Sequence, residues 1–216
     1  MSEASLSVNI VPELSAIGSR PAPRSMRLAA PMLAREGPRV ADVGCGYMRG
    51  TLELLQYHSA VYAVDSEYQK SRIAQRIAEC ERYTTFAGFK TWDEFKSSRL
   101  RLSGAYVVNV LHTLPARDQR IELLEAVRQN LKQNGFAVLD VPYYEHYYKE
   151  RMTPENTYGD GYIFRQGSDK YTFYRFTTVA ELDKWAEIAG FGFDFRIVDN
   201  HHWVRVYRPR SVLRTR

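Results

Sequence analysis

Short apolar runs alternate along this chain with segments whose apolar residues recur every three or four positions. The apolar runs occupy residues 39–43, 60–64, 104–110 and 135–141, with a shorter run near residues 83–87. Helical spacing of apolar residues falls over residues 24–36, 50–57, 68–80 and 117–132. Strands and helices that alternate at these lengths predict an α/β fold, in which a mainly parallel sheet is covered by helices on both faces.

The end of the chain departs from this alternation. A helix is expected from Thr177 to Ala189, with a threonine cap, Glu181 reaching back to the cap, and Gly190 at its end. Residues 193–198 and 203–207 then form two strand-like runs with four residues between them. Parallel strands need a longer crossover, so these two strands are predicted to pair as an antiparallel hairpin.

The junction between the first strand and its helix is rich in glycine. Gly44 and Gly46 follow the strand in the run Asp-Val-Gly-Cys-Gly, and Asp65 ends the next apolar run 21 residues after Gly44. Glycine permits a tight turn and a close approach of a ligand to the backbone. A glycine turn followed by an acid at this distance is typical of a site for an adenosine cofactor, whose ribose hydroxyls bond the carboxylate.

Two classes of enzyme use this layout. Dinucleotide-binding enzymes place a third glycine where this chain has Arg49, which disfavours a NAD-dependent reductase. Residues 42–46 instead resemble the first motif of class I S-adenosylmethionine (SAM)-dependent methyltransferases, although that family usually has a glycine in place of Met48. Residues 105–115, which end in Leu-His-Thr-Leu-Pro, are similar to the fourth strand segment of the same family. Residues 134–142, where Asn-Gly ends a helix before a strand, fit the fifth.

The resemblance covers residues 26–209 and implies a single domain over residues 1–216. It implies a doubly wound, Rossmann-like sheet of seven strands, mostly parallel, with an antiparallel strand at the C-terminal end. Residues 1–24 are expected to form an irregular arm with a short helix, and residues 143–176 an aromatic-rich insertion that binds substrate.

The resemblance also implies SAM as the cofactor. In this family the acid at Asp42 lies near the methionine amino end, and a loop after the third strand, here residues 88–93, flanks the adenine. Trp92 would stack on the ring and Asp93 would meet its amino group; alternatively Trp92 belongs to the core and Asp93 caps a helix. The predicted cofactor residues are Asp42, Gly44, Cys45, Gly46, Asp65, Trp92, Asp93 and Asn109.

Tyrosine and phenylalanine are concentrated at residues 143–176, where the runs 162–165 and 171–174 predict a hairpin. Such a segment either packs on the domain or forms an aromatic wall around a flat or apolar acceptor, and both can hold together. The substrate residues predicted here are Tyr143, Tyr144 and Tyr174. A hydroxyl acceptor would also need a base, for which the candidates are His112, Glu145 and His146; His112 is equally well explained as a structural histidine.

Composition limits the partners. A hydrophobic content of 44% and a charged content of 25% are typical of a globular domain. No apolar run approaches the roughly 20 residues that span a bilayer, and the first residues lack a signal-peptide pattern, so a cytoplasmic protein is expected. Two cysteines, Cys45 and Cys80, cannot make a disulfide framework, and no Cys/His spacing suggests zinc or another metal.

A small-molecule acceptor is the favoured interpretation, and a nucleic-acid methyltransferase is the main alternative. The net charge of +5 and the arginines near the C-terminus, at positions 205, 208, 210, 214 and 216, suit either a solvated tail or a phosphate contact. Residues 140–143 resemble the Asp-Pro-Pro-Tyr box of DNA amino-methyltransferases, but they follow the fifth strand rather than the fourth. A non-catalytic, methyltransferase-like scaffold is a further alternative, disfavoured by the intact glycine turn and Asp65.

Overall fold

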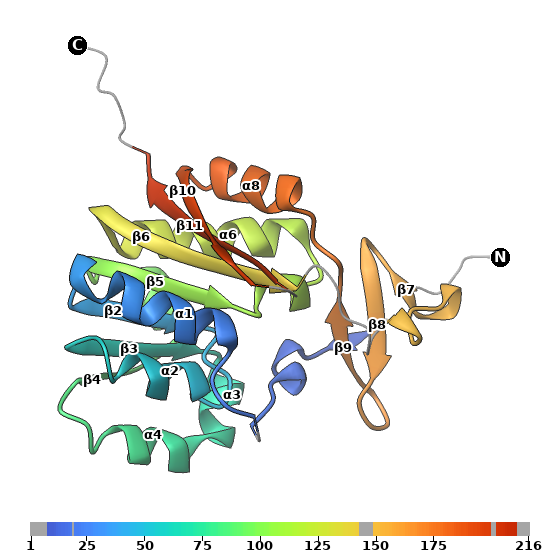
Figure 1. Ribbon diagram of the computed structural model, residues 1–216. Helices are drawn as coiled ribbons and strands as arrows, with labels where there is room; N and C mark the ends of the chain where they lie inside the picture. The colour runs from blue at the N-terminus through green and yellow to red at the C-terminus, as the bar shows by residue number, and fades with distance from the viewer. Residues whose placement is uncertain (1–7, 19, 143–148, 200–201, 211–216) are drawn as a thin grey trace.

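The computed structural model describes residues 8–18, 20–142, 149–199 and 202–210. The main sheet consists of seven strands: β2 (Arg39–Val43), β3 (Ala60–Asp65), β4 (Phe86–Thr91), β5 (Leu102–Val108), β6 (Leu131–Pro142), β10 (Phe191–Val198) and β11 (His202–Pro209). Their order in the sheet is β10-β11-β6-β5-β2-β3-β4 (Figure 1). Only the two pairs made by β11 are antiparallel. The predicted parallel sheet with a reversed strand and a C-terminal hairpin is therefore confirmed.

Helices cover both faces of this sheet, as predicted. One face carries α1 (Arg24–Leu33), α2 (Arg49–Leu54) and α4 (Ala74–Cys80), and the other carries α5 (Trp92–Ser97), α6 (Arg117–Asn130) and α8 (Val179–Ile188). Successive residues of a strand point to opposite faces. In β5, Tyr106 thus packs with the α1 side while its neighbours Ala105 and Val107 pack with the α6 side. Burial on both faces explains why the central strands are mainly apolar.

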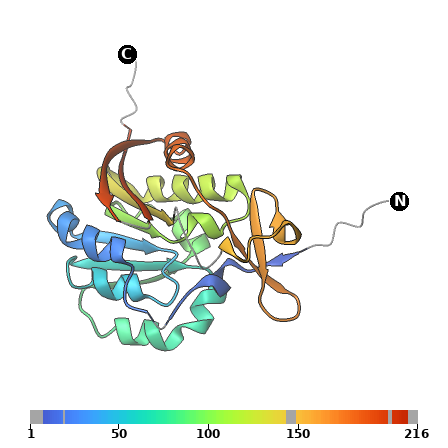
Figure 2. The same cartoon turned by 45° about the vertical axis from the view of Figure 1, so that its right-hand side comes forward.

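A second, smaller sheet lies beyond the carboxyl ends of the main strands (Figures 1 and 2). It contains β1 (Asn9–Ile10), β7 (Thr157–Tyr158), β8 (Gly161–Arg165) and β9 (Lys170–Tyr174) in the order β1-β9-β8-β7. The β8–β9 hairpin matches the sequence prediction. The sheet is tied to the main domain where the amide of Arg175 donates to the carbonyl of His112 at 3.1 Å. His112 belongs to the short helix η3 (Leu111–Thr113), which follows β5.

The N-terminal residues join this second sheet. β1 runs parallel to β9, and the amide of Val11 donates to the carbonyl of Tyr171 at 2.8 Å. A short 3-10 helix, η1 (Pro12–Ser15), follows, consistent with the expected irregular arm that contains a short helix. Other 3-10 turns are η2 (Ala34–Glu36) and η4 (Pro154–Asn156).

Several boundaries differ from the sequence prediction. The helix expected over residues 68–80 is two helices, α3 (Glu67–Arg72) and α4, separated at Ile73, which has φ −117° and ψ 19° and whose side chain is buried in the core. The strand expected near residues 83–87 begins only at Phe86, since its pairing with Val61 sets the register. Asn134 and Gly135 do not end α6, which stops at Asn130; both lie inside β6.

Within the described residues, no helix combines the length and the apolar character needed to cross a bilayer.

Candidate functional site

The glycine turn after β2 has the backbone that the sequence predicts. Gly44 and Gly46 adopt φ values of 74° and 53°, in the left-handed region that favours glycine. The amides of Gly44 and Cys45 both donate to the carbonyl of Val64, at 2.8 and 3.0 Å. A Cβ on Gly44 would lie 2.3 Å from Cγ2 of Val110, so the first glycine is required for packing as well as for the turn.

Met48 occupies the place where the methyltransferase motif usually has glycine, and its backbone remains left-handed. Its φ is 58°, an unusual value for a residue with a side chain, and α2 begins at the next residue. The side chain is fully buried in the core beneath α1 and α2. The loop therefore keeps a glycine-like conformation, and the burial of the methionine offsets the backbone strain.

Two carboxylates flank the turn at the ends of neighbouring strands. Asp42 is buried and accepts a hydrogen bond from Oγ1 of Thr51 at 2.7 Å; burial raises its pKa to about 7. Asp65 accepts from the amides of Gly46 and Ser66, both at 2.8 Å. Burial raises the pKa of Asp65 to about 6, although these two bonds oppose the shift. The turn thus holds two acids that are costly to ionise.

A cavity of about 710 Å³ opens in front of the turn and extends to the second sheet. It is lined by nine of the residues predicted from the sequence: Asp42, Gly44, Cys45, Gly46, Asp65, Trp92, Asn109, His112 and Tyr174. The described structure therefore brings most of the predicted cofactor residues together with one predicted catalytic and one predicted substrate residue. Tyr143, Tyr144, Glu145 and His146 lie outside the described residues.

Trp92 and Asp93 are not in a loop. Gly88 to Thr91 belong to β4, and Trp92 begins α5, which Thr91 caps in a capping box with Glu94. The strand runs directly into the helix, so no loop separates β4 from α5. Trp92 lines the cavity with its ring packed against Phe95, whereas Asp93 is not among the cavity-lining residues.

His112 and Tyr174 form one wall of the cavity. Their rings meet edge to face, with centroids 5.0 Å apart. His112 is buried, and its Nδ1 has no hydrogen-bond partner among the described residues. Burial lowers the pKa of His112 to about 3, and the nearby His202 and Arg120 add to the effect. This imidazole is therefore neutral across the physiological range.

Sequence reasoning did not identify a second polar cluster among the residues that line the cavity, made by Ser25, Asp140 and His202. Oδ1 of Asp140 lies 2.6 Å from Nδ1 of His202, and Oδ2 accepts a hydrogen bond from Oγ of Ser25. Asp140 appeared in the sequence only as part of an approximate Asp-Pro-Pro-Tyr box. His202 appeared only as the end of a hairpin connection.

The N-terminal arm also contributes to the cavity, which sequence reasoning did not predict. Ala16 and Arg20 line it, and a Cβ placed on Gly46 would lie 3.3 Å from Cβ of Ala16. Arg72 on α3 fixes the arm by donating to the carbonyl of Glu13 at 3.1 Å. Segments close to the N-terminus thus lie directly against the glycine turn.

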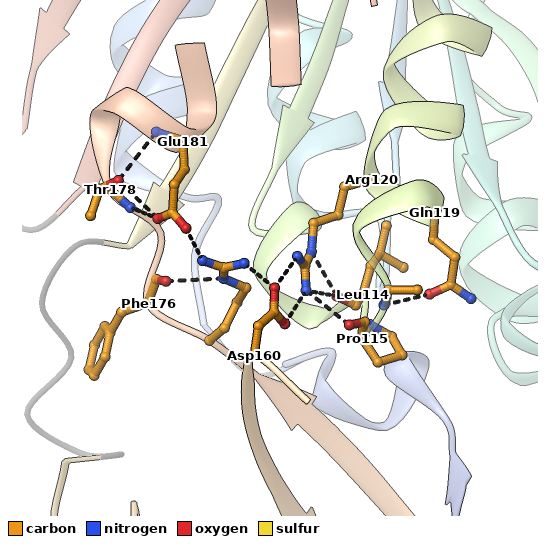
Figure 3. A network of polar contacts seen from close by, with 10 residues as sticks. Leu114, Pro115, Gln119, Arg120, Asp160, Phe176, Thr178 and Glu181 are labelled. Atoms are coloured by element: carbon orange, nitrogen blue, oxygen red, sulfur yellow. Dashed lines mark hydrogen bonds and ion pairs between the residues drawn. The ribbon is translucent and has the colours of Figure 1, made fainter. Parts of the chain in front are cut away.

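An ion-pair network anchors the second sheet to α6 and α8 (Figure 3). Arg120 on α6 is fully buried and donates to both oxygens of Asp160, at 2.8 and 2.9 Å. Asp160, in the turn between β7 and β8, also accepts from Arg175, whose other nitrogen pairs with Glu181. Since Arg120 also donates to the carbonyl of Leu114, the network holds the second sheet against the end of the main sheet.

Comparisons with known proteins agree with this arrangement. No model of a known protein family matches the sequence, and no curated protein matches it. Solved structures do match. The CcbJ methyltransferase from Streptomyces caelestis is 18% identical, with a TM-score of 0.64 over 88% of this chain and 91% of that chain. A SAM-dependent methyltransferase from Clostridium acetobutylicum is 12% identical, with a TM-score of 0.65 over 85% and 89%.

A third match carries ligands. The 1,6-didemethyltoxoflavin-N1-methyltransferase of Burkholderia thailandensis was solved with bound 1,6-didemethyltoxoflavin and S-adenosylhomocysteine. It is 21% identical, with a TM-score of 0.59 over 87% of this chain and 79% of that chain. With the strand order, the reversed strand and the glycine turn, these matches show that the chain has the class I SAM-dependent methyltransferase fold.

Proposed function

We propose that this chain is an enzyme that transfers a methyl group from SAM to a small-molecule acceptor. The observation that carries the proposal is the single cavity that joins the glycine turn and its two carboxylates to an aromatic wall. One end offers groups suited to an adenosine and an amino acid, and the other offers a surface suited to a flat acceptor. Methyl transfer requires both ligands to meet within one enclosed volume.

The residues at the glycine turn fit SAM. Asp65 accepts one backbone hydrogen bond at each oxygen, and a carboxylate has about four lone-pair sites, so it can accept further bonds from ribose hydroxyls. Asp42 is a buried acid whose ionised form a nearby positive group would stabilise, and SAM carries an ammonium and a sulfonium. Trp92 offers a ring face for an adenine. A volume of about 710 Å³ falls within the range of small-molecule sites.

When bound, SAM supplies an activated methyl group on sulfur. The chain's own part is positioning and exclusion of water. The bonds from Gly46 and Ser66 fix the Asp65 carboxylate, and Thr51 fixes that of Asp42. The second sheet closes the acceptor end with Phe164, Phe173 and Tyr174. The Arg120–Asp160 pair then keeps this cover in place while the acceptor is aligned.

A small acceptor is favoured over a nucleic acid because the described arginines near the C-terminus are already paired. Arg205 bonds Asp183, Arg208 bonds Glu36 and Asp194, and Arg210 pairs with Glu187 at 3.0 Å. They do not form an open basic strip of the kind that binds phosphates. Arg214 and Arg216 lie outside the described residues. The 1,6-didemethyltoxoflavin-N1-methyltransferase, which shares the fold, was solved with bound 1,6-didemethyltoxoflavin, a small molecule.

Isothermal titration of SAM into the protein and into Asp65→Ala tests the proposal. Removing hydrogen bonds to a charged group costs about 1.5–3 kcal/mol each, so the affinity should fall at least tenfold. Asp118→Ala, an exposed acid in the first turn of α6 outside the cavity, is the matched control and should bind as the wild type does. Equal affinity in all three proteins, or no SAM binding by the wild type, would refute the proposal.

A further inference from the structure

The Asp140–His202 pair is built into the main sheet rather than placed on a loop. Asp140 lies in the buried part of β6, two residues before the strand ends, and His202 opens the antiparallel neighbour β11, opposite Pro142. Asp140 is fully buried, while the His202 side chain is 27% exposed. The two side chains approach across the strand pair to 2.6 Å between Oδ1 and Nδ1. Because strands hold them, their relative geometry is rigid.

The surroundings of Asp140 fix the tautomer of His202. One carboxylate oxygen accepts the hydroxyl proton of Ser25, so the other is left for the imidazole. An ionised carboxylate is an acceptor only, and Nδ1 must therefore carry the proton that it donates. In the neutral ring the basic lone pair then resides on Nε2. This is the relation of an orienting acid to a histidine base.

The pair faces the cavity at the acceptor end. Asp140, His202 and Ser25 all line the cavity, and the amide of Asn109 donates to the carbonyl of Asp140 at 3.1 Å. Asn109 follows β5, which lies beside β2 and its glycine turn. The imidazole, on β11, is thus at the same sheet edge as the proposed SAM site, with β6 and β5 between β11 and β2.

His112, the other described histidine of the cavity, is less suited to accept a proton. No carboxylate contacts its ring among the described residues, and burial lowers its pKa to about 3. A base with so low a pKa gains little when it takes a proton at neutral pH. The cavity that His202 lines is also lined by the charged or titratable residues Glu13, Arg20, Arg24, Asp42, Cys45, Tyr47, Arg49, Asp65, Lys96, His112, Glu122, Asp140, Tyr174 and Asp199. Among them, Nε of Arg24 lies 3.9 Å from Oδ2 of Asp199. Asp140 bonds the imidazole directly through a carboxylate oxygen.

We propose that His202 is the general base for methyl transfer, that Asp140 is its positioning residue, and that the acceptor reacts through a hydroxyl group. This proposal rests on the proposed function. In the step, the acceptor O–H bond breaks and its proton goes to Nε2 of His202. The oxygen electron pair forms the new bond to the methyl carbon, while the carbon–sulfur bond breaks and its electrons leave with the sulfur. The Asp140 carboxylate stabilises the imidazolium that results.

The first test compares His202→Asn with the wild type. The asparagine amide can still donate to Asp140 in place of Nδ1, but it has no atom in place of Nε2. Turnover of phenols with methyl-labelled SAM should fall at least 100-fold, while SAM affinity stays within about twofold. His58→Asn, which removes a buried imidazole outside the cavity, controls for lost packing. Added imidazole should partly restore His202→Ala.

Full turnover by His202→Asn with normal SAM binding would overturn this proposal alone. Failure of the wild type to bind SAM would overturn the proposed function and this proposal with it. The acceptors used in these assays are phenols, each compared with the aniline that carries the same ring substituents. Methylation of anilines only, or of neither class, would overturn the assignment of a hydroxyl acceptor.

The second test is the pH profile of Asp140→Asn. Loss of the carboxylate destabilises the imidazolium, so the acidic limb of kcat/KM should move to lower pH and the plateau should fall about tenfold or more. A purely structural role for Asp140 would lower activity without moving this limb.

Nitrogen-15 NMR of labelled histidine gives an independent check. A His202 whose Nδ1 carries no hydrogen-bonded proton in the folded wild type would overturn the proposal.

Discussion

Asp42→Asn should make the ligand-free protein more stable at pH 8 and remove much of the pH dependence of its stability. Asp42 is 3% exposed, and burial raises its pKa from 3.8 to about 7. The folded state therefore keeps a proton that the unfolded state has already lost between pH 4 and pH 7. Stability falls as pH rises through this window and is level above about pH 8. A pKa difference of about 3 corresponds to a loss of about 4 kcal/mol, an upper limit since the structure can relax.

Asparagine is the appropriate replacement because it imitates the protonated acid. Its side-chain oxygen can still accept the hydrogen bond from Thr51, which is 2.7 Å long in the wild type. Urea unfolding at steps between pH 4 and pH 8 measures the free energy for both proteins. The difference should be small at pH 4 and should reach about 2–4 kcal/mol in favour of the variant at pH 8. Parallel pH curves, or a variant less stable at pH 8, would refute the reasoning.

The same variant should bind SAM more weakly, and this separates function from stability. An ionised Asp42 favours a positive ligand group, so wild-type SAM affinity should rise from pH 5 to pH 8 and then level off. Asp42→Asn should lose the part of that rise that belongs to Asp42, while the part that belongs to Asp65, whose pKa is raised to about 6, should remain. Titration calorimetry across the pH range measures the effect, with the exposed-site variant Asp118→Ala as control. A pH dependence of SAM affinity in Asp42→Asn that is identical to that of the wild type would exclude this acid from the cofactor site.

Three further substitutions test the geometry. Gly46→Ala forces a side chain into φ 53° and within 3.3 Å of Ala16, so we expect a loss of about 1–2 kcal/mol in urea unfolding and a weaker SAM affinity in calorimetry. Asp160→Ala leaves the buried Arg120 without its bidentate partner; we expect a loss of about 2–4 kcal/mol and a KM for the acceptor that rises more than the Kd for SAM. Met48→Gly relaxes the left-handed backbone but empties a buried site, so the net change should be a destabilisation of about 2–4 kcal/mol, and a more stable variant would show that strain dominates there.

The sequence predicted those parts of the fold and site whose signals are local. Residues 39–43 were predicted as a strand and form β2 with the same bounds, because Val40, Ala41 and Val43 follow one another closely in a segment that is buried on both faces. The glycine turn could be predicted because its left-handed backbone conformation favours glycine at Gly44 and Gly46 themselves. Asp65 could be predicted because the 21 residues from Gly44 to Asp65 are the length of one helix and the strand that follows it.

The remaining features depend on contacts between segments that are far apart along the chain. Asp140 and His202 are 62 residues apart and meet only because β11 pairs with β6 in one register. β1 is two residues long, too short for a periodic pattern, and is defined by its pairing with β9. The role of Asp160 also could not be predicted, since its two arginine partners come from α6 and from the end of β9. Such pairings are properties of the assembled sheet rather than of any local segment.

Asp42 and Asp65 differ from Asp160 in the groups that surround their carboxylates. Burial raises the pKa of Asp42 and Asp65, and the hydrogen bonds that they accept come from neutral groups. Burial also acts on Asp160, but the hydrogen bonds and charges of Arg120 and Arg175 outweigh it and lower the pKa. The charge of Asp160 is thus satisfied within the protein, which suits a structural anchor. Asp42 and Asp65 keep an unmet preference for positive charge, and both lie beside the glycine turn, where a sulfonium and an ammonium would satisfy it.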